Sequence, residues 1–135
     1  MLFRSKMANF LMEAGIKPDL IITSSAARAF ETAMIFAEIL DVGEKNIMAT
    51  RKLYYCSVKT ILDQIFGLPE TVGCIMVVSH NPCISELTRW LSAGKSFFMD
   101  NTQVTILEFD MEYWYQTGEQ KPVTFRSQRP FEITT

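Results

Sequence analysis

The sequence lacks the features that mark several large classes of protein. Acidic and basic residues nearly balance over the 135 residues, at 15 and 13, and both kinds are mixed along the chain. Such a chain has no basic patch for nucleic acid or an anionic membrane. No apolar run approaches the roughly 20 residues of a membrane-spanning helix, and the N-terminus has no apolar signal segment. We therefore predict one cytoplasmic domain over residues 1–135, with neither nucleic acid nor membrane as a partner.

Potential metal ligands are also scarce. The chain contains one histidine, His80, and its three cysteines, Cys56, Cys74 and Cys83, show no C-x-x-C spacing. These counts argue against a zinc site and against a disulfide framework. We interpret Cys83 as a small packed residue, the alternative being a thiol of lowered pKa at a helix start. We expect no metal and no cofactor.

What the sequence does contain is an alternation of apolar strands and amphipathic helices. Apolar residues at three- and four-residue spacings predict helices over residues 3–14, 26–40, 57–66 and 83–91. Continuous apolar runs predict strands buried on both faces over residues 20–23 and 74–79, and an antiparallel pair over 103–110 and 122–126. Residues 46–53 are left unassigned. The pattern predicts a layered α/β sheet, mostly parallel, with an antiparallel edge near the C-terminus.

Hydroxyl residues and an arginine follow the first predicted strand. Ser24 and Ser25 precede the second helix as candidate N-caps, and Arg28 lies about one turn into it. Because a helix N-terminus binds anions and a guanidinium group can hold two phosphate oxygens, this segment is a candidate phosphate site. The alternative is that a serine only caps the helix and that Arg28 is solvated or forms a surface salt bridge.

The histidine stands at the end of the other buried strand. His80 is followed by Asn81 and Pro82, and its imidazole could donate a hydrogen bond to a phosphoryl oxygen or transfer a proton. The alternative is a histidine with a structural hydrogen bond. Both polar groups follow strand ends, where open α/β sheets bind their ligands.

Together these segments resemble the histidine phosphatase superfamily, and in particular its small SixA-type phosphohistidine phosphatases. The resemblance rests on P-D-L-I-I at residues 18–22, R-A at 28–29, T-A at 32–33 and V-S-H-N-P at 78–82, in that order. Ser79 stands where the branch has glycine. The resemblance covers nearly the whole chain and implies a three-layer, phosphoglycerate mutase-like α/β/α sandwich. It also implies a phosphate pocket formed by Arg28, His80, Ser24 and Asn81, with Arg28 and His80 as catalytic residues.

The chain departs from this family in one respect. The branch carries its nucleophilic histidine in an R-H-G or R-H-A motif after a central first strand, whereas residues 7–11 match the helix that follows, and His80 matches the second histidine. We expect the first central strand to be missing, through a misplaced start, a degenerate gene or a fragment. By the resemblance, the complete protein would hydrolyse a phosphorylated protein or a small phosphomonoester. This chain would have little or no activity.

A second function class stays open for the same reason. Without the nucleophile, the pocket would serve as a non-catalytic site for phosphate or a phosphopeptide. Loss of a central strand would also expose sheet edges, through which copies of the chain could associate. Both uses of the fold are alternatives to catalysis.

Overall fold

The computed structural model describes residues 2–54, 57–95 and 98–132. The helices are α1 (Leu2–Glu13), α2 (Ala27–Leu40), α3 (Val58–Phe66) and α4 (Cys83–Leu91). The strands are β1 (Leu20–Ser24), β2 (Ile47–Thr50), β3 (Ile75–Val78), β4 (Val104–Glu108) and β5 (Thr124–Gln128). Short 3-10 helices are η1 (Glu44–Asn46), η2 (Arg51–Leu53), η3 (Trp114–Gln116) and η4 (Pro130–Glu132). No helix in these described ranges has the length and apolar character needed to cross a bilayer.

The structure confirms the predicted helices and strands and adds one strand. β2 lies in the stretch left unassigned, and its two middle residues are exposed, so it has no continuous apolar run. β5 begins two residues later than predicted. The predicted start, Pro122, has no N–H group to donate to a ladder. The N–H of Val123 bonds to the carbonyl of Glu108 at 2.7 Å, and the ladder then starts with the pair Glu108 and Thr124.

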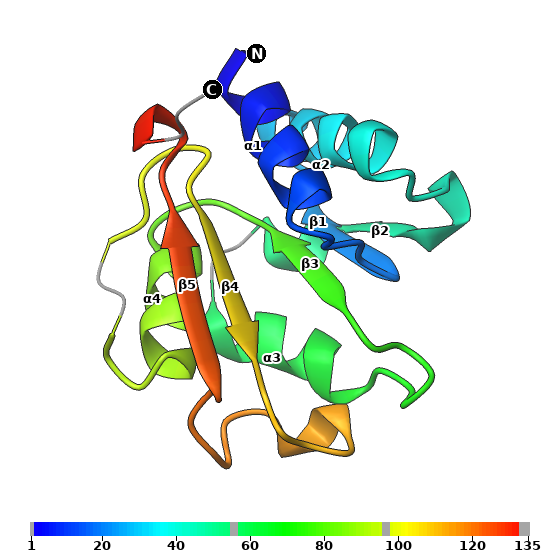
Figure 1. Ribbon diagram of the computed structural model, residues 1–135. Coiled ribbons are helices and arrows are strands. Elements are labelled where there is room, and N and C mark those ends of the chain that lie inside the picture. The colour runs from blue at the N-terminus through cyan, green and yellow to red at the C-terminus, as the bar shows by residue number, and fades with distance from the viewer. Residues whose placement is uncertain (1, 55–56, 96–97, 133–135) are drawn as a thin grey trace.

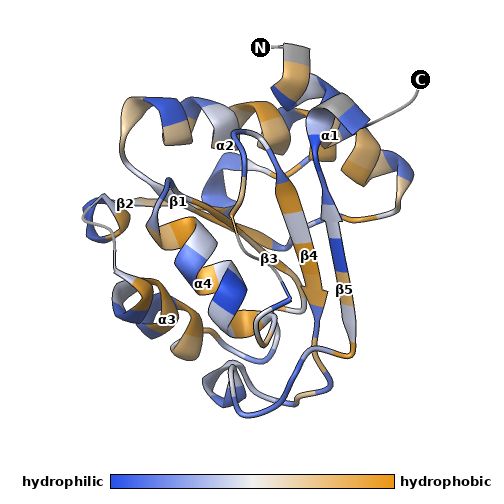
Figure 2. Cartoon of the chain, turned by 90° about the vertical axis from the view of Figure 1, so that its left-hand side faces the viewer, coloured by the Kyte–Doolittle hydropathy of each residue, from blue (hydrophilic) through white to orange (hydrophobic). Residues whose placement is uncertain are grey.

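The strands form two separate sheets. The first is parallel in the order β2-β1-β3, with Ile21 opposite Ile47 and Met76. The second is the antiparallel hairpin of β4 and β5, with Ile106 opposite Arg126. Figures 1 and 2 show α1 and α2 on one face of the parallel sheet and α3 and α4 on the other. This is the predicted three-layer α/β/α arrangement with antiparallel pairing near the C-terminus.

β1 lies between two apolar clusters. Its Ile21 belongs to a cluster with Met7 and Phe36 of α1 and α2, whereas the next residue, Ile22, belongs to a cluster with Ile61 and other residues of α3 and α4. Successive side chains of a strand point to opposite faces, so one apolar run covers both layers. The prediction of a strand buried on both faces is confirmed for β1.

For β3 that prediction is only partly right. Its side chains pack against both clusters, Met76 and Val78 on the α1 and α2 side and Ile75 and Val77 on the other. All four nevertheless remain half-buried. The reason is the position of β3 at the edge of the parallel sheet, where it has a strand neighbour on one side only.

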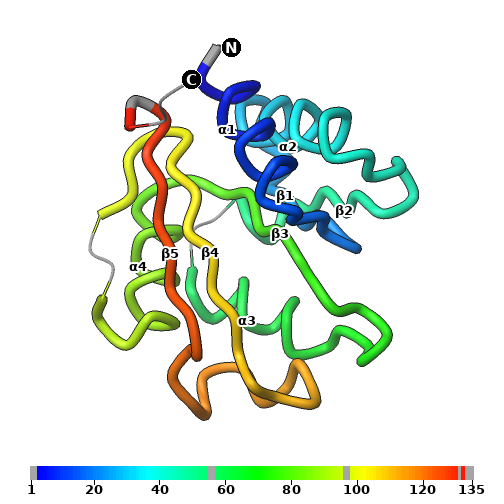
Figure 3. Tube along the Cα trace, in the orientation of Figure 1, coloured from blue at the N-terminus to red at the C-terminus, as the bar shows by residue number. Residues whose placement is uncertain are grey.

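Side-chain contacts attach the hairpin to the rest of the molecule. The guanidinium of Arg126 lies 5.0 Å from the centre of the Phe10 ring on α1, and Trp114 Nε1 donates to the carbonyl of Val72 at 2.7 Å. Ile106 packs against the α1 and α2 cluster. After β5 the chain continues to η4 near its C-terminal end, and η4 contacts α1 (Figure 3).

Candidate functional site

The candidate site lies at the carboxyl ends of β1 and β3. These strands pair in parallel, so Ser24 at the end of β1 and Val78 at the end of β3 lie at the same edge of the sheet. Ser24 is fully buried, and its hydroxyl accepts a hydrogen bond from the N–H of Ala26 at 3.2 Å. The N–H of Ser25 donates to the carbonyl of Thr50 at 3.2 Å. The turn from β1 into α2 is therefore fixed by one hydrogen bond within itself and one to the end of β2.

The prediction that Ser24 or Ser25 caps α2 is wrong. The N-cap residue is Ala26, and no side chain caps the helix. The Ser24 hydroxyl is occupied by the N–H of Ala26 itself, which precedes the helix, so it does not serve the first turn. A helix whose first N–H groups carry no side-chain cap keeps its attraction for an anion.

Arg28 is the second residue of α2 and its side chain is exposed. Its carbonyl accepts a hydrogen bond from the Thr32 hydroxyl at 2.9 Å, as part of the helix. Within the described ranges its guanidinium forms no ion pair. Of the two alternatives weighed for Arg28, the surface salt bridge is therefore not observed.

His80 lies two residues after the end of β3 and is half-buried, and its Nε2 atom is shielded from solvent. Its ring meets the ring of Tyr54 edge to face, with centroids 6.2 Å apart and planes at 71°. Its carbonyl accepts a hydrogen bond from the N–H of Ile84 at 3.1 Å, at the start of α4. The Asn81–Pro82 peptide bond that follows is cis. The contact with Tyr54 was not foreseen, because Tyr54 follows a segment that the sequence left unassigned.

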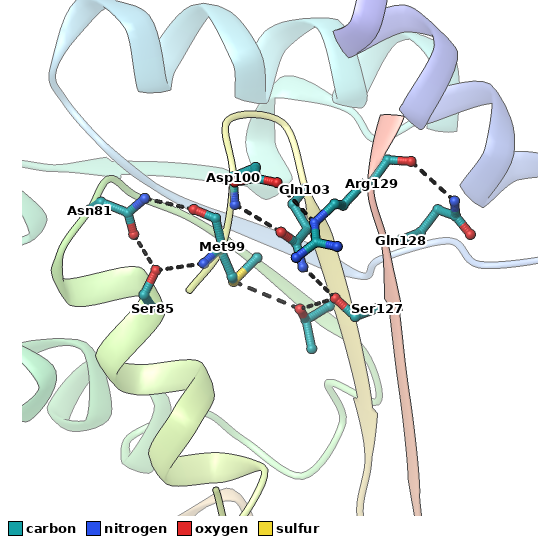
Figure 4. A network of polar contacts seen from close by, with 9 residues as sticks. Asn81, Ser85, Met99, Asp100, Gln103, Ser127, Gln128 and Arg129 are labelled. Carbon is teal, nitrogen blue, oxygen red and sulfur yellow. Dashed lines mark hydrogen bonds and ion pairs between the residues drawn. The ribbon is translucent and has the colours of Figure 1, made fainter. Parts of the chain in front are cut away.

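The side chain of Asn81 connects this turn to a distant loop (Figure 4). Its Nδ2 donates to the carbonyl of Met99 at 2.8 Å, and its Oδ1 accepts from the hydroxyl of Ser85. The Ser85 oxygen also accepts from the N–H of Met99 at 2.9 Å. Both polar atoms of the Asn81 amide are thus bonded within the protein, and a direct bond to phosphate stays a prediction.

The network continues from this loop into the hairpin (Figure 4). Gln103 accepts from the N–H of Asp100 at 2.8 Å and donates to the hydroxyl of Ser127 on β5 at 2.7 Å. Asp100 also pairs with Arg129, whose Nε lies 2.8 Å from the carboxylate. The His80 turn is therefore linked through polar side chains to the end of β5.

An open groove of about 1780 Å³ brings the predicted site residues together. Arg28, His80 and Asn81 all line it, next to Ala26 and Ala27 at the start of α2. Ser24 is not among its lining residues and lies buried behind them. Three of the four residues predicted to bind phosphate therefore line one groove. A cation at a helix N-terminus and an imidazole lining the same groove suit a phosphoryl group or another oxyanion.

The cysteines differ from one another. Cys74 is a free thiol whose pKa is raised, first by burial and then by the carboxylates of Asp19 and Glu108. Cys83 is packed in the cluster beneath α3 and α4, as expected, but it is also disulfide-bonded, which the sequence reading did not predict. Cys56 lies outside the described residues. The sequence did not reveal the disulfide, because spacing along the chain does not report which cysteines meet in the fold. In the described part of the chain, no three His, Cys, Asp or Glu side chains gather as a metal site.

The fold is similar to that of several solved structures. The structure of the protein histidine phosphatase SixA complexed with tungstate aligns with a TM-score of 0.78 and 19% identity, over 97% of this chain and 81% of that one. A candidate phosphohistidine phosphatase SixA from Agrobacterium tumefaciens aligns at 0.62 and 24% identity, over 70% and 58%. One from Nakamurella multipartitia aligns at 0.74 and 16%, over 95% and 81%.

Sequence comparison alone gives no such match. No family model matches the chain, and no curated protein matches its sequence. At these identities the likeness shows the fold, and that fold is the one of the SixA phosphohistidine phosphatases.

Proposed function

We propose that this chain binds a phosphoryl group in the groove at the carboxyl ends of β1 and β3, as a SixA-like phosphatase with a reduced catalytic apparatus. The observation that carries the proposal is that Arg28 and His80, from two segments far apart in the sequence, line one groove at the same edge of the sheet. The substrate class proposed is phosphohistidine in a protein, or a related phosphomonoester. Tungstate, found in one of the similar structures, is an oxyanion of the same shape class as phosphate.

Each residue has a distinct role in this proposal. The guanidinium of Arg28 holds two phosphoryl oxygens, and the uncapped start of α2 adds its N–H groups and the positive end of its dipole. The imidazole of His80 donates to a third oxygen and stabilises charge on the transferring group. Tyr54 limits the orientations of the His80 ring through their edge contact. Asn81 acts as a positioning residue, because its amide fixes the turn on which His80 stands.

We propose that turnover by these 135 residues is low. Phosphoryl transfer through a phosphohistidine intermediate needs one imidazole as the nucleophile and a second group to stabilise the transition state. The sequence contains only His80, and it has no R-H-G or R-H-A segment. Removal of a nucleophile takes away most of the rate and leaves what binding and electrostatics supply. The single histidine also favours the second candidate function, a module that recognises phosphate or a phosphopeptide without hydrolysing it.

The test combines binding with turnover. Inorganic phosphate and tungstate are titrated calorimetrically into the purified chain, into Arg28→Ala and into His80→Ala. Arg51→Ala serves as a control, because Arg51 is an exposed arginine that is not among the residues lining the groove. Loss of a charge-assisted hydrogen bond costs about 1.5–3 kcal/mol, so Arg28→Ala should weaken binding by roughly 10- to 100-fold. Arg51→Ala should leave it unchanged.

Turnover is measured on a phosphohistidine peptide and on a generic phosphomonoester. The proposal expects phosphate release at the rate of the buffer, alongside binding that depends on Arg28. Release that disappears in both the Arg28 and His80 variants would show that the chain retains chemistry with one histidine, and low activity would be refuted. Equal affinity for phosphate in the wild type and Arg28→Ala would refute the site itself.

A further inference from the structure

A disulfide-bonded cysteine stands at the edge of the candidate site. Cys83, the first residue of α4, is disulfide-bonded, whereas Cys74 is a free thiol. The sequence contains three cysteines, and the third, Cys56, lies outside the described residues. Because Cys74 is free, Cys56 is the remaining cysteine with which Cys83 can pair within the chain. Such a bond would link the segment before α3 to the first turn of α4.

The Cys83 sulfur contacts the turn that carries His80. The Ser79 hydroxyl lies 3.7 Å from this sulfur, and the hydroxyl is the donor because a disulfide sulfur carries no hydrogen. On the other side of the turn, the carbonyl of His80 accepts from the N–H of Ile84, the residue after Cys83. The residue before His80 and His80 itself are thus both bonded to the first turn of α4.

Tyr54 connects the same two segments without a covalent bond. Its ring meets the His80 ring edge to face, with centroids 6.2 Å apart, and it stands two residues before Cys56 in the sequence. A Cys56–Cys83 disulfide would therefore reinforce this ring contact. Tyr54 is 50% exposed, so burial holds its ring less firmly than that of a core residue. A covalent link two residues away removes part of the freedom that remains.

We propose that Cys56 and Cys83 form a redox switch: their disulfide holds Tyr54 against the His80 imidazole, and reduction loosens this contact. An imidazole that is already oriented loses less freedom when a ligand binds. The oxidised chain therefore binds a phosphoryl group more tightly than the reduced chain. This effect on binding rests on the proposed function, whereas the control of the Tyr54–His80 contact does not.

The switch is a thiol–disulfide exchange with a dithiol. Cys83 is only 1% exposed, so a thiolate of the dithiol attacks the partner sulfur, the S–S bond breaks, and Cys83 leaves as a thiolate. The start of α4 and the Ser79 hydroxyl stabilise this thiolate. The second thiol of the dithiol then resolves the mixed disulfide and becomes oxidised. Each departing sulfur takes up the proton lost by its attacker, so the protein gains two electrons and two protons.

The single histidine of the sequence makes the contact measurable, because the His80 imidazole gives one set of NMR signals and the Tyr54 ring current shifts them. The full chain is equilibrated with glutathione disulfide or with dithiothreitol. The signals should move on reduction, and Cys56→Ala and Cys83→Ala should show the reduced position in both conditions. Cys74→Ala is the matched control and should respond as the wild type does. In Tyr54→Leu most of the response should be lost.

Peptide mapping of the oxidised chain, after free thiols are blocked, should find Cys56 joined to Cys83. A blocked Cys83 thiol, or a Cys83 bond to a second chain, would overturn the proposal. Identical His80 signals in the two redox states would also overturn it, since the disulfide would then be a structural cross-link only. Loss of the folded circular dichroism spectrum on reduction would do the same, because the bond would then be required for the fold.

Binding of inorganic phosphate tests the consequence for the candidate site. By calorimetry the reduced chain should bind phosphate about two- to tenfold more weakly than the oxidised chain, the effect expected for one side chain that must be immobilised. Equal affinities in the two forms would overturn the switch of binding. If neither form binds phosphate, the proposed function fails, while the His80 signals still decide whether the disulfide controls the Tyr54 contact.

Discussion

Asn81 and Met99, 18 residues apart in the sequence, are joined by a hydrogen bond of 2.8 Å from the Asn81 Nδ2 to the Met99 carbonyl. Ser85 completes the connection, since its oxygen bonds to the Asn81 side chain and to the Met99 N–H. The turn that carries His80 is thus fixed to the loop before β4. The Asn81 amide, the Ser85 hydroxyl and the Met99 backbone therefore satisfy one another's hydrogen bonds in a mostly buried position.

Ser85→Ala should lower the free energy of unfolding by about 1–3 kcal/mol. The substitution leaves the Met99 N–H and the Asn81 oxygen without this partner, and Ser85 is only 6% exposed. Urea unfolding followed by circular dichroism measures the change. Ser25→Ala, at an exposed serine of the same site, should stay within about 0.5 kcal/mol of wild type. Equal losses in both variants would contradict the role given to Ser85.

Gly118→Ala should destabilise the protein more than Gly94→Ala. Both glycines have positive φ, 93° and 86°, but a Cβ at Gly118 would lie 2.1 Å from the Trp90 ring, whereas nothing lies within 4 Å of one at Gly94. We expect a loss of about 1 kcal/mol at Gly94 from backbone strain and a larger loss at Gly118, where the half-exposed Trp90 ring must also move away. In a Trp90→Ala background the two losses, measured by urea unfolding, should become equal.

Asp19→Ala should weaken the attachment of the segment before β3. The Asp19 carboxylate accepts from the N–H groups of Gly73 and Cys74 at 2.8 and 3.0 Å, across 54 and 55 residues of sequence. Loss of both exposed bonds should cost about 1–2 kcal/mol in urea unfolding. Asp19→Asn retains an acceptor oxygen and should cost less. A larger loss for asparagine than for alanine would contradict the assignment.

Cys74 should react slowly with iodoacetamide at pH 8. Burial, and then the carboxylates of Asp19 and Glu108, raise its pKa, so little reactive thiolate is present. Asp19→Asn should speed the reaction, which peptide mass spectrometry follows at this residue. Because its pKa is raised, the Cys74 thiol keeps its proton to higher pH in the folded protein than in the unfolded chain. Relative to Cys74→Ala, stability should therefore fall as pH rises above about 8.5. If the free energy of unfolding of the wild type instead rose relative to Cys74→Ala as the pH increased, the direction of the pKa shift would be contradicted.

The sequence predicted the parts of this molecule that depend on local pattern. The apolar runs of β1 and β3 are long enough to be read as strands, and parallel strands bring Arg28 and His80 to one edge by topology. The N-cap was predicted wrongly. Serine is a residue type favoured at helix N-caps, but the Ser24 hydroxyl accepts its bond from the N–H of Ala26, which precedes the helix. The bonds of Asn81 depend on a loop 18 residues away, which no local pattern reveals. β2 escaped prediction because its middle residues are exposed.

The division of the strands into two sheets has a mechanical consequence. Separating β1 from β3 requires breaking a ladder of backbone hydrogen bonds, whereas the hairpin is fastened by scattered side-chain contacts, such as Trp114 to Val72 and Arg126 to Phe10. Under a pulling force or a large thermal fluctuation, we expect β3 and β4 to separate before the strands within either sheet do. The boundary between the two sheets, which runs along the groove, is therefore where we expect the structure to open first.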